Sequence, residues 1–251
     1  MSKPLIMVAP NGARLNQQDH PEIPLTIAET VATAEKCFKA GAQALHLHVR
    51  DKEGLHSLDA GLYREAIAEL ASHVLSMRIQ ITTEAVGIYS VAEQLECLRG
   101  VKADWASISV REIARDHELA ASVYATCEEM GTEVQHILYD AEDAKLLGEW
   151  QKSGIVRDDQ KSVLLVLGRY SKNQMSNSGD IKPFLASLPD HSRWMLCAFG
   201  AAEHECLKVA ASLGGDCRVG FENSRTNSNG EQWPDNSTSV AAIHSDLSGA
   251  L

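Results

Sequence analysis

The sequence predicts a (β/α)₈ barrel, a closed ring of eight parallel strands in which each strand is followed by a helix. Two observations carry this prediction: short β-rich runs alternate with helical segments along the whole chain, and several strands have one polar face. The 251 residues also match the about 250 residues typical of one such barrel. Because no low-complexity linker divides the chain, we expect a single catalytic domain over residues 1–251.

The candidate strands are eight short runs rich in β-branched and other apolar residues. The segments between them have the helical period, with apolar residues three and four apart. One such segment ends on Lys39 and Gly41, as helix C-termini commonly do. Eight strand–helix repeats imply parallel strands, in either a barrel or a doubly wound sheet. The eight runs are 5–11, 43–50, 78–84, 104–110, 133–139, 162–168, 193–200 and 217–223, and the clearest helical segments are 27–41, 59–75 and 117–131.

The faces of the strands favour the barrel over the doubly wound sheet. Side chains alternate faces along a strand, so each apolar set can pack under outer helices while the polar set points inward. A flat sheet that is buried on both faces should not carry polar faces on several neighbouring strands, whereas a barrel with an active site at its mouth should. The polar sets are His46, His48 and Arg50; Gln80, Thr82 and Glu84; and Ser107, Ser109 and Arg111.

His46 and His48 form a candidate metal-binding pair. A His-x-His sequence on a strand places both imidazoles on one face, close enough to share an ion. Apolar neighbours keep the pair off a solvated edge, and it stands at the C-terminal end of its strand, where barrel enzymes place their chemistry. Glu222, at the end of the last run, becomes a neighbour once the barrel closes. Two histidines and a carboxylate with one open position are typical of catalytic zinc.

Other polar residues on the inner face are candidates for substrate contacts. Hydroxyls on Thr82, Ser107 and Ser109 can hold a carboxylate or an enolate oxygen, or they can simply satisfy one another. Arg218 shares the parity of Glu222, and because a buried arginine must be paired, it either orients a ligand or forms a structural salt bridge. His136 has the pattern of a histidine packed in the core.

Two other metal-binding classes share parts of this pattern. His46, His48 and Glu53 match the spacing of cupins, but cupins are all-β proteins and the flanking segments here are helical. Metal hydrolases of the amidohydrolase type are barrels that use His-x-His, but on the first strand and with further histidines on the fifth and sixth. Only His136 fits that scheme, which stays open as the alternative enzyme class.

The composition excludes some partners. The formal net charge is −11 and the acids are spread along the chain, so no basic surface for nucleic acid is indicated. No apolar stretch approaches the about 18 residues of a membrane span, and the N-terminal segment does not resemble a signal peptide. Six scattered cysteines without a C-x-x-C pair are typical of reduced thiols, so we expect a cytoplasmic protein. An anionic substrate would need local positive charge.

With these residues in view, the sequence resembles the β-keto acid cleavage enzyme family over essentially its whole length. The similarity is strongest in NGAR followed by HP and IP (11–24), AGAQALHLHVRD (40–51), QITT (80–83) and RVGFEN (218–223). The resemblance implies a zinc-dependent barrel, commonly tetrameric, that condenses a β-keto acid with acetyl-CoA and releases acetoacetate and a new CoA ester. It implies His46, His48 and Glu222 as zinc ligands.

The resemblance also assigns roles around the metal. Thr82 and Ser107 stand where the family has small hydroxyl residues that contact the keto acid, and Arg218 matches an arginine that supports the catalytic acid–base group. The family has Asp at the position of Asn223, where that Asp is implicated as the base. An amide cannot accept a proton, so we take Glu84, where the family commonly has Gly, as the candidate replacement.

A second departure from the family concerns the substrate. Members that cleave an amino-keto acid have Glu at the position of Arg14, which suits an ammonium group. Arg14 reverses that preference, and Arg111 adds to it, so we expect a keto acid with a second anionic or polar group. The residues leave three functions open: acyl transfer with keto acid cleavage, metal-assisted hydrolysis, and ligand binding without catalysis.

Overall fold

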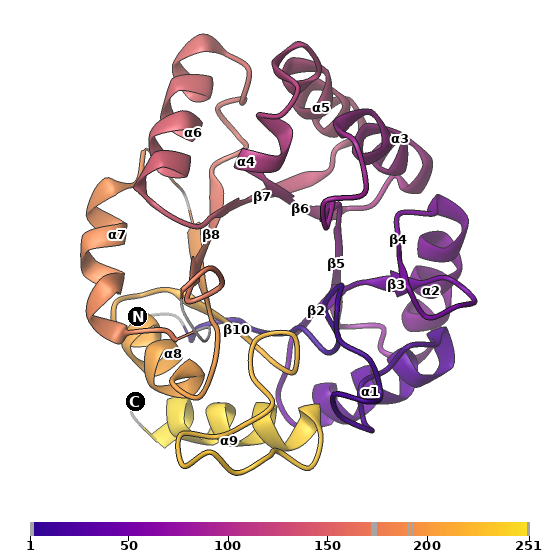
Figure 1. Ribbon diagram of the computed structural model, residues 1–251, viewed down its shortest axis with the longest axis vertical. Coiled ribbons are helices and arrows are strands. Elements are labelled where there is room, and N and C mark those ends of the chain that lie inside the picture. Colours follow the sequence, from indigo (N-terminus) through magenta and orange to yellow (C-terminus); the bar gives the residue numbers. More distant parts are fainter. Residues whose placement is uncertain (1–2, 172–174, 190, 192, 250–251) are drawn as a thin grey trace.

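Eight parallel strands close into a barrel, and helices surround it (Figure 1). This is a computed structural model that describes residues 3–171, 175–189, 191 and 193–249. Each of the eight predicted runs contains one barrel strand or most of it, so the barrel prediction is confirmed. In order around the ring, the strands are β1 (Ile6–Val8), β10 (Asp216–Val219), β9 (Arg193–Ala198), β8 (Ser162–Leu167), β7 (Glu133–Leu138), β6 (Trp105–Ser109), β5 (Arg78–Thr82) and β2 (Ala44–Leu47).

The helices begin and end at residues whose side chains or backbone favour those positions. Thr26 and Glu29 form a capping box at the start of α1, and Asp59 caps α2. Gly131 ends α5 in the left-handed conformation. The predicted helices at 27–41, 59–75 and 117–131 are confirmed. The helices are α1 (Ile27–Lys39), α2 (Ala60–His73), α3 (Val91–Val101), α4 (Val110–Ile113), α5 (His117–Met130), α6 (Ala141–Ser153), α7 (Ile181–Ser187), α8 (Glu203–Ser212) and α9 (Asn236–Gly249), with a 3₁₀ turn η2 at Ser178–Asp180.

The two faces of the strands separate as the alternation predicts. The outward set, including Leu45 and Ile81, belongs to the main core cluster with apolar side chains of the surrounding helices. The inward set is apolar along one side of the barrel, where a second cluster includes Leu164 and Met195. On the other side of the barrel the inward-facing side chains are polar; they include His46 and Gln80, which are buried and in contact. The chemistry-bearing residues therefore share one interior.

The strands end earlier than predicted, which changes where three site residues lie. β10 ends at Val219, and Glu222 lies in the turn that follows; Gly220 begins this turn at a φ of 135°. A Cβ on Gly220 would lie 2.6 Å from the backbone oxygen of Ala9, so only glycine fits there. His48 follows the end of β2, and Arg111 lies in helix α4 rather than on a strand.

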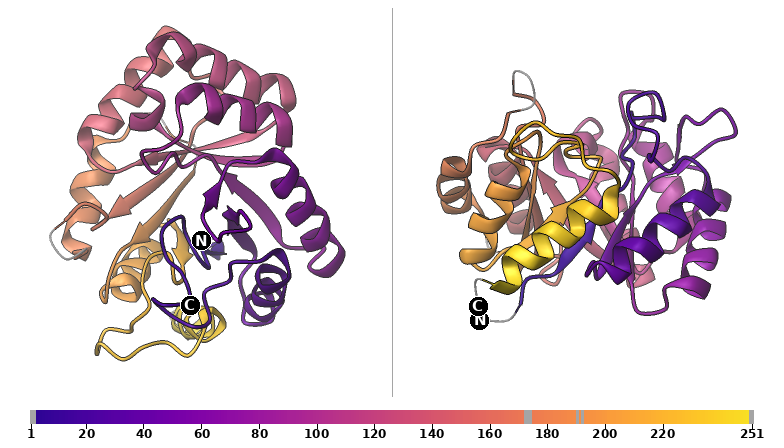
Figure 2. Two further views of the ribbon diagram at one scale, coloured as in Figure 1. Left: turned by 45° about the vertical axis from the view of Figure 1, so that its right-hand side comes forward. Right: turned by 90° about the horizontal axis from the view of Figure 1, so that it is seen from below.

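A short antiparallel hairpin, which the sequence did not predict, extends from the mouth of the barrel. It pairs β3 (Val49–Arg50) with β4 (His56–Ser57). At the opposite end of the chain, α9 packs against α1, α8 and β1, and Figure 2 shows it alongside the barrel. Asn236, the first residue of α9, accepts a hydrogen bond from the backbone of Phe221 and donates one to Pro10. This residue ties the first and last loops of the mouth together. Within the described residues, no helix is long and apolar enough to cross a membrane.

Candidate metal centre

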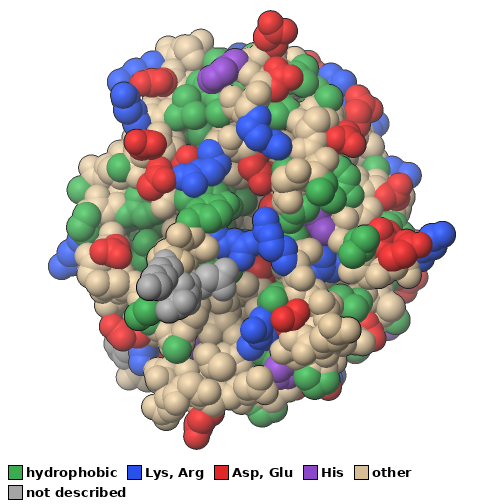
Figure 3. Space-filling view, in the orientation of Figure 1, with side chains coloured by type: hydrophobic (Ala, Val, Ile, Leu, Met, Phe, Trp, Pro, Cys, Tyr) green, Lys and Arg blue, Asp and Glu red, His purple; other side chains and the backbone are tan. Residues whose placement is uncertain are grey.

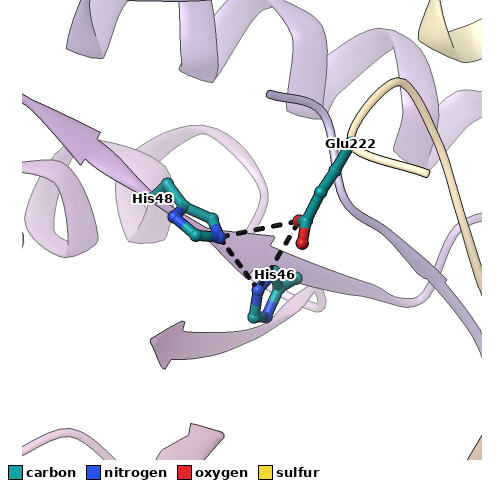
Figure 4. A group of neighbouring side chains, drawn as sticks. All are labelled: His46, His48 and Glu222. Atoms are coloured by element: carbon teal, nitrogen blue, oxygen red, sulfur yellow. Dashed lines mark hydrogen bonds and ion pairs between the residues drawn. The ribbon is translucent and has the colours of Figure 1, made fainter. Parts of the chain in front are cut away.

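The side chains of His46, His48 and Glu222 converge at the mouth of the barrel (Figure 4). The Nε2 atoms of the two histidines lie 3.2 Å apart. One carboxylate oxygen of Glu222, Oε2, lies 3.6 Å from Nε2 of His46 and 3.5 Å from Nε2 of His48. The two histidines are buried, and the Glu222 side chain is 12% exposed. The structure thus brings together the three residues that the sequence predicted as metal ligands.

The hydrogen bonds of His46 leave its Nε2 atom free of a proton. Its Nδ1 lies 2.8 Å from Oε1 of Gln80, which can only accept, so Nδ1 carries the hydrogen. Gln80 in turn donates to Gln135, which fixes its amide orientation. Burial, with Arg218 nearby, lowers the pKa of His46 to about 3, so the ring is neutral at pH 7. A neutral imidazole protonated on Nδ1 presents the lone pair of Nε2.

His48 is oriented in the same way by a histidine from the β3–β4 hairpin. Nε2 of His56 lies 2.8 Å from the backbone oxygen of Glu84, so it is the donor, which leaves Nδ1 of His56 as an acceptor. Nδ1 of His48 faces that acceptor at 3.5 Å. Burial, with His48 beside it, lowers the pKa of His56 to about 4 and keeps it neutral. Nε2 of His48 is therefore also free to bind a cation.

Glu222 reaches the histidines from the turn after β10, which β1 separates from β2 in the ring. Burial opposes its ionisation, but the Arg218 guanidinium holds the pKa of Glu222 well below its usual range. Nη2 of Arg218 donates to its other oxygen, Oε1, at 3.1 Å. Gly12 leaves room for the side chain, because a Cβ there would lie 2.5 Å from Cγ of Glu222. Gly12 belongs to the loop after β1, and Arg50 holds that loop by donating to the backbone oxygens of residues 12, 13 and 15.

These contacts fit a bound divalent cation. Two lone pairs on nitrogen and one carboxylate oxygen face one another, an arrangement that is repulsive without a positive charge between them. Oε2 of Glu222 is buried and has no hydrogen-bond partner among the described residues. Gln80 contacts Nδ1 of His46, and His56 contacts Nδ1 of His48. Metal-ligating histidines usually have such a hydrogen-bond partner on the ring nitrogen that does not bind the metal. The donor set fits the expected metal site, and it leaves the identity of the metal open.

A small cavity, which we call the reaction cavity, opens beside two of the three ligands, His46 and Glu222. Thr82 lines it, as predicted, and so does Glu84. Ser107 and Ser109 are buried nearby, but Ser107 lies 3.4 Å from the backbone oxygen of Ile81. The full lining of the cavity is His46, Thr82, Glu84, Ile137, Tyr139, Val166, Arg169, Phe199, Arg218 and Glu222.

A larger cavity of about 260 Å³, the arginine-lined cavity, shares Glu84, Arg169 and Glu222 with the reaction cavity. Arg14 and Arg225 also line it, and Figure 3 shows blue basic side chains gathered near the middle of this face. Nη1 of Arg14 donates to Glu84 at 2.6 Å, and Arg169 lies 3.7 Å from the same carboxylate. Arg225 forms no ion pair among the described residues. The cavity supplies the local positive charge that an anionic substrate needs.

Arg111 lies in a third cavity, beyond Tyr139 and Arg169. Nε of Arg111 donates to both oxygens of Asp143 at 3.0 Å, and Nη2 donates to Asp140 at 2.5 Å. Two carboxylates thus compensate its charge. A role for Arg111 in binding the substrate stays a prediction, and Arg14 and Arg225 are better placed for it.

Asn223 lies behind Glu222 in a buried network. Its Oδ1 accepts hydrogen bonds from Cys197 at 3.1 Å and from Arg218 at 3.4 Å. Its Nδ2 donates to the backbone oxygen of Arg218 and to Glu203. Asn223 also lines the arginine-lined cavity.

The structure disfavours the two other metal-binding classes. His136 points outward, packs against Tyr124 of α5 and lies 2.8 Å from the backbone oxygen of Gln160, so it cannot join the metal ligands. Glu53 lies in an exposed turn, where its backbone N–H donates to Asp51. Neither residue completes a metal site with His46 and His48.

Sequence reasoning missed three residues of this site. His56 stands on a hairpin too short to leave a clear strand pattern. Arg169 follows β8 in Gly168-Arg169-Tyr170, and nothing in the sequence distinguishes it from an ordinary basic residue in a loop. Glu203 begins a helix, where acids are common for reasons of helix stability alone. For His56, the only signal was a third histidine close to His46 and His48 in the chain.

The fold and the site together define a (β/α)₈ barrel with a candidate metal centre at its catalytic face. The sequence matches the family model for the beta-keto acid cleavage enzyme over residues 3–248, and the chain therefore belongs to this enzyme family. The family prediction, and with it the prediction of an enzyme, is confirmed.

Individual relatives agree with this placement. A 3-keto-5-aminohexanoate cleavage enzyme from Fusobacterium nucleatum is 27% identical over 89% of this chain and 84% of that protein. A 3-oxoadipate:acetyl-CoA acetyltransferase from Cupriavidus necator is 22% identical over 89% of this chain and 81% of that protein. Among solved structures, ObcA in complex with oxaloacetate has the same fold, with a TM-score of 0.73 at 16% identity; the match covers 92% of this chain but only 64% of ObcA.

Proposed function

We propose that this protein is a zinc-dependent β-keto acid cleavage enzyme that uses acetyl-CoA. The observation that carries the proposal is the convergence of two histidine Nε2 atoms and one buried carboxylate oxygen beside the reaction cavity. Membership of the family supports it, and so does the acetyltransferase among its relatives.

His46, His48 and Glu222 would hold the metal, and two histidines with one carboxylate are a ligand set of catalytic zinc. When bound, a zinc ion supplies a Lewis acid that polarises carbonyl and carboxylate oxygens. The ligands come from the ends of β2 and β10, which flank β1, and would leave the side toward the reaction cavity for a substrate.

The proposed reaction exchanges two acyl groups. The acetyl group moves from the sulfur of CoA to the carbon between the ketone and the carboxylate of the keto acid. The bond between that carbon and the original ketone carbon breaks, and the remaining acyl group moves to the sulfur. The products are acetoacetate and a new acyl-CoA, so atoms and electrons balance without an oxidant or reductant.

Residues of the reaction cavity have distinct proposed roles. The carbon between ketone and carboxylate must lose a proton, and Glu84 is a carboxylate in the cavity that is not a proposed metal ligand. Thr82 lines the same cavity and offers a hydroxyl to the keto acid, with Ser107 and Ser109 as further candidates behind it. Arg218, oriented by Asn223, holds Glu222 and brings positive charge to the reacting oxygens.

The charge of the arginine-lined cavity indicates the substrate class. Arg14, Arg169 and Arg225 outnumber the two acids that line it, Glu84 and Glu222. A keto acid with a second carboxylate would meet these guanidiniums, whereas an ammonium group would be repelled. One relative is named for 3-oxoadipate and ObcA was solved with oxaloacetate, and both compounds are keto diacids. A homo-oligomer, a tetramer by family resemblance, and a cytoplasmic location remain predictions.

Metal analysis combined with a coupled assay for acetoacetate tests the proposal. Purified protein should contain zinc and should form acetoacetate only when acetyl-CoA and a keto acid are both present. Product that forms without CoA would favour the metal hydrolase, and bound metal without turnover on a panel of keto acids would favour a binding protein.

A further inference from the structure

Glu203 is a buried acid that no role described above explains. It is 1% exposed, begins helix α8, and lines neither the reaction cavity nor the arginine-lined cavity. Its Oε1 accepts two hydrogen bonds, one from the backbone N–H of Gly220 and one from Nδ2 of Asn223, each at 3.1 Å. Its Oε2 has no hydrogen-bond partner among the described residues. Burying such a polar group costs free energy, so its presence here calls for a role.

The amide of Asn223 can be held in only one orientation. Its nitrogen faces two acceptors, Glu203 and the backbone oxygen of Arg218, the latter at 2.9 Å. Its oxygen faces two donors, Cys197 and Nη2 of Arg218. Without the acceptor on Glu203, the amide would lose one of the two contacts that turn its oxygen toward Arg218.

The same network continues to the metal ligand. Nη2 of Arg218 is shared among Oδ1 of Asn223, Oε1 of Glu222 and the sulfur of Cys197. Nε of Arg218 has no partner among the described residues, so the guanidinium depends on these few contacts for its position. Because Arg218 binds one oxygen of Glu222, it decides how the other oxygen is presented to the two histidines.

We propose that Glu203 is a positioning residue of the metal centre: it fixes the amide of Asn223, which holds Arg218 and thereby orients Glu222. The inference rests on the metal site of the proposed function, and it is independent of the reaction carried out there. It also explains why an amide at 223 is compatible with this site. An Asp at 223 would place two carboxyl groups in contact inside the protein.

The protonation of Glu203 agrees with this role. Burial raises the pKa of Glu203 well above its usual range. A neutral acid accepts both hydrogen bonds through Oε1, and a glutamine at this position could do the same with its amide oxygen. The length of the side chain, rather than its charge, therefore decides whether residue 203 can make these two hydrogen bonds.

Two substitutions separate reach from charge. Glu203→Gln keeps the length of the side chain and the accepting oxygen but cannot ionise. Glu203→Asp keeps the carboxyl group but is one methylene shorter, so it cannot contact Asn223 from the same backbone position. We expect zinc affinity, measured by competition with a chromophoric chelator, to stay within about threefold for Glu203→Gln and to fall about tenfold or more for Glu203→Asp.

The same changes at Glu205, an exposed acid two residues along α8, are the matched controls and should leave zinc affinity unchanged. Asn223→Ala breaks the link from its other end and should weaken zinc binding as Glu203→Asp does. Melting curves recorded without metal establish that each variant is folded at the assay temperature.

Loss of affinity in Glu203→Gln, or full affinity in either Glu203→Asp or Asn223→Ala, would overturn the proposal. Absence of zinc binding by the unaltered protein would overturn it as well. Zinc binding without keto acid cleavage would count against the proposed reaction alone.

Discussion

His56 presents its Nδ1 atom to Nδ1 of His48 at a distance of 3.5 Å. Nε2 of His56 donates to the backbone oxygen of Glu84, so its Nδ1 can accept from Nδ1 of His48. This contact leaves the lone pair of His48 Nε2 facing His46 and Glu222. A hairpin outside the barrel therefore helps to set the state of a metal ligand inside it.

The first prediction concerns this contact. His56→Phe keeps an aromatic ring in the hairpin but removes the acceptor, so we expect zinc affinity to fall by about tenfold or more, the usual effect of losing an outer hydrogen bond to a metal ligand. His73→Phe, on the exposed end of α2, is the control. Equal zinc affinity in the two variants would show that His56 does not orient His48.

Glu84 is the carboxylate that we propose as the proton acceptor. Glu84→Gln retains the shape of the side chain and removes the base, so turnover should fall by about 100-fold or more while zinc remains bound. His46→Ala, by contrast, should lose both zinc and turnover. Full activity in Glu84→Gln would refute the assignment of the base.

The arginines of the arginine-lined cavity should decide which keto acid the enzyme prefers. Arg225→Gln and Arg14→Gln each remove a charged donor that faces the cavity, and hydrogen bonds to charged groups contribute about 1.5–3 kcal/mol. We expect kcat/KM for a keto diacid to fall by about tenfold or more in each variant, and kcat/KM for a keto acid without a second charged group to change little in Arg225→Gln. Arg99→Gln, on the exposed face of α3, is the control. A stronger preference for an amino-keto acid in the unaltered protein would contradict the assigned substrate class.

His136 makes stability depend on pH. Burial lowers its pKa to about 4 in the folded protein, against about 6.5 in an unfolded chain. The unfolded state therefore binds more protons below pH 6.5, and the stability contributed by neutral His136 is lost as the pH falls from 6.5 towards 4. For a fully buried group this amounts to about 3 kcal/mol. Denaturant unfolding of metal-free protein at pH 7 and pH 4 should show a smaller loss in His136→Gln, and identical losses would contradict this account.

The fold could be predicted from the sequence because strand–helix alternation and strand parity are local patterns. The metal ligands followed from the same patterns, since His46 and His48 lie two residues apart and Glu222 follows the strand that closes the ring. Their outer partners could not be predicted, because His56 and Glu203 reach the site through a hairpin and a helix start whose positions depend on tertiary packing. Arg111 illustrates the same limit. The strand pattern continues through it in sequence, but the chain turns into α4 first and leaves its guanidinium with Asp140 and Asp143.

The fate of the acetyl group tests the central claim most directly. Acetyl-CoA labelled with ¹³C in both acetyl carbons should be incubated with the zinc-loaded protein and a keto diacid, and the acetoacetate formed should be examined by NMR. We predict that the label occupies the ketone carbon and the methyl carbon of acetoacetate, while the new acyl-CoA carries none. Unlabelled acetoacetate, or acetate as the only labelled product, would contradict the account.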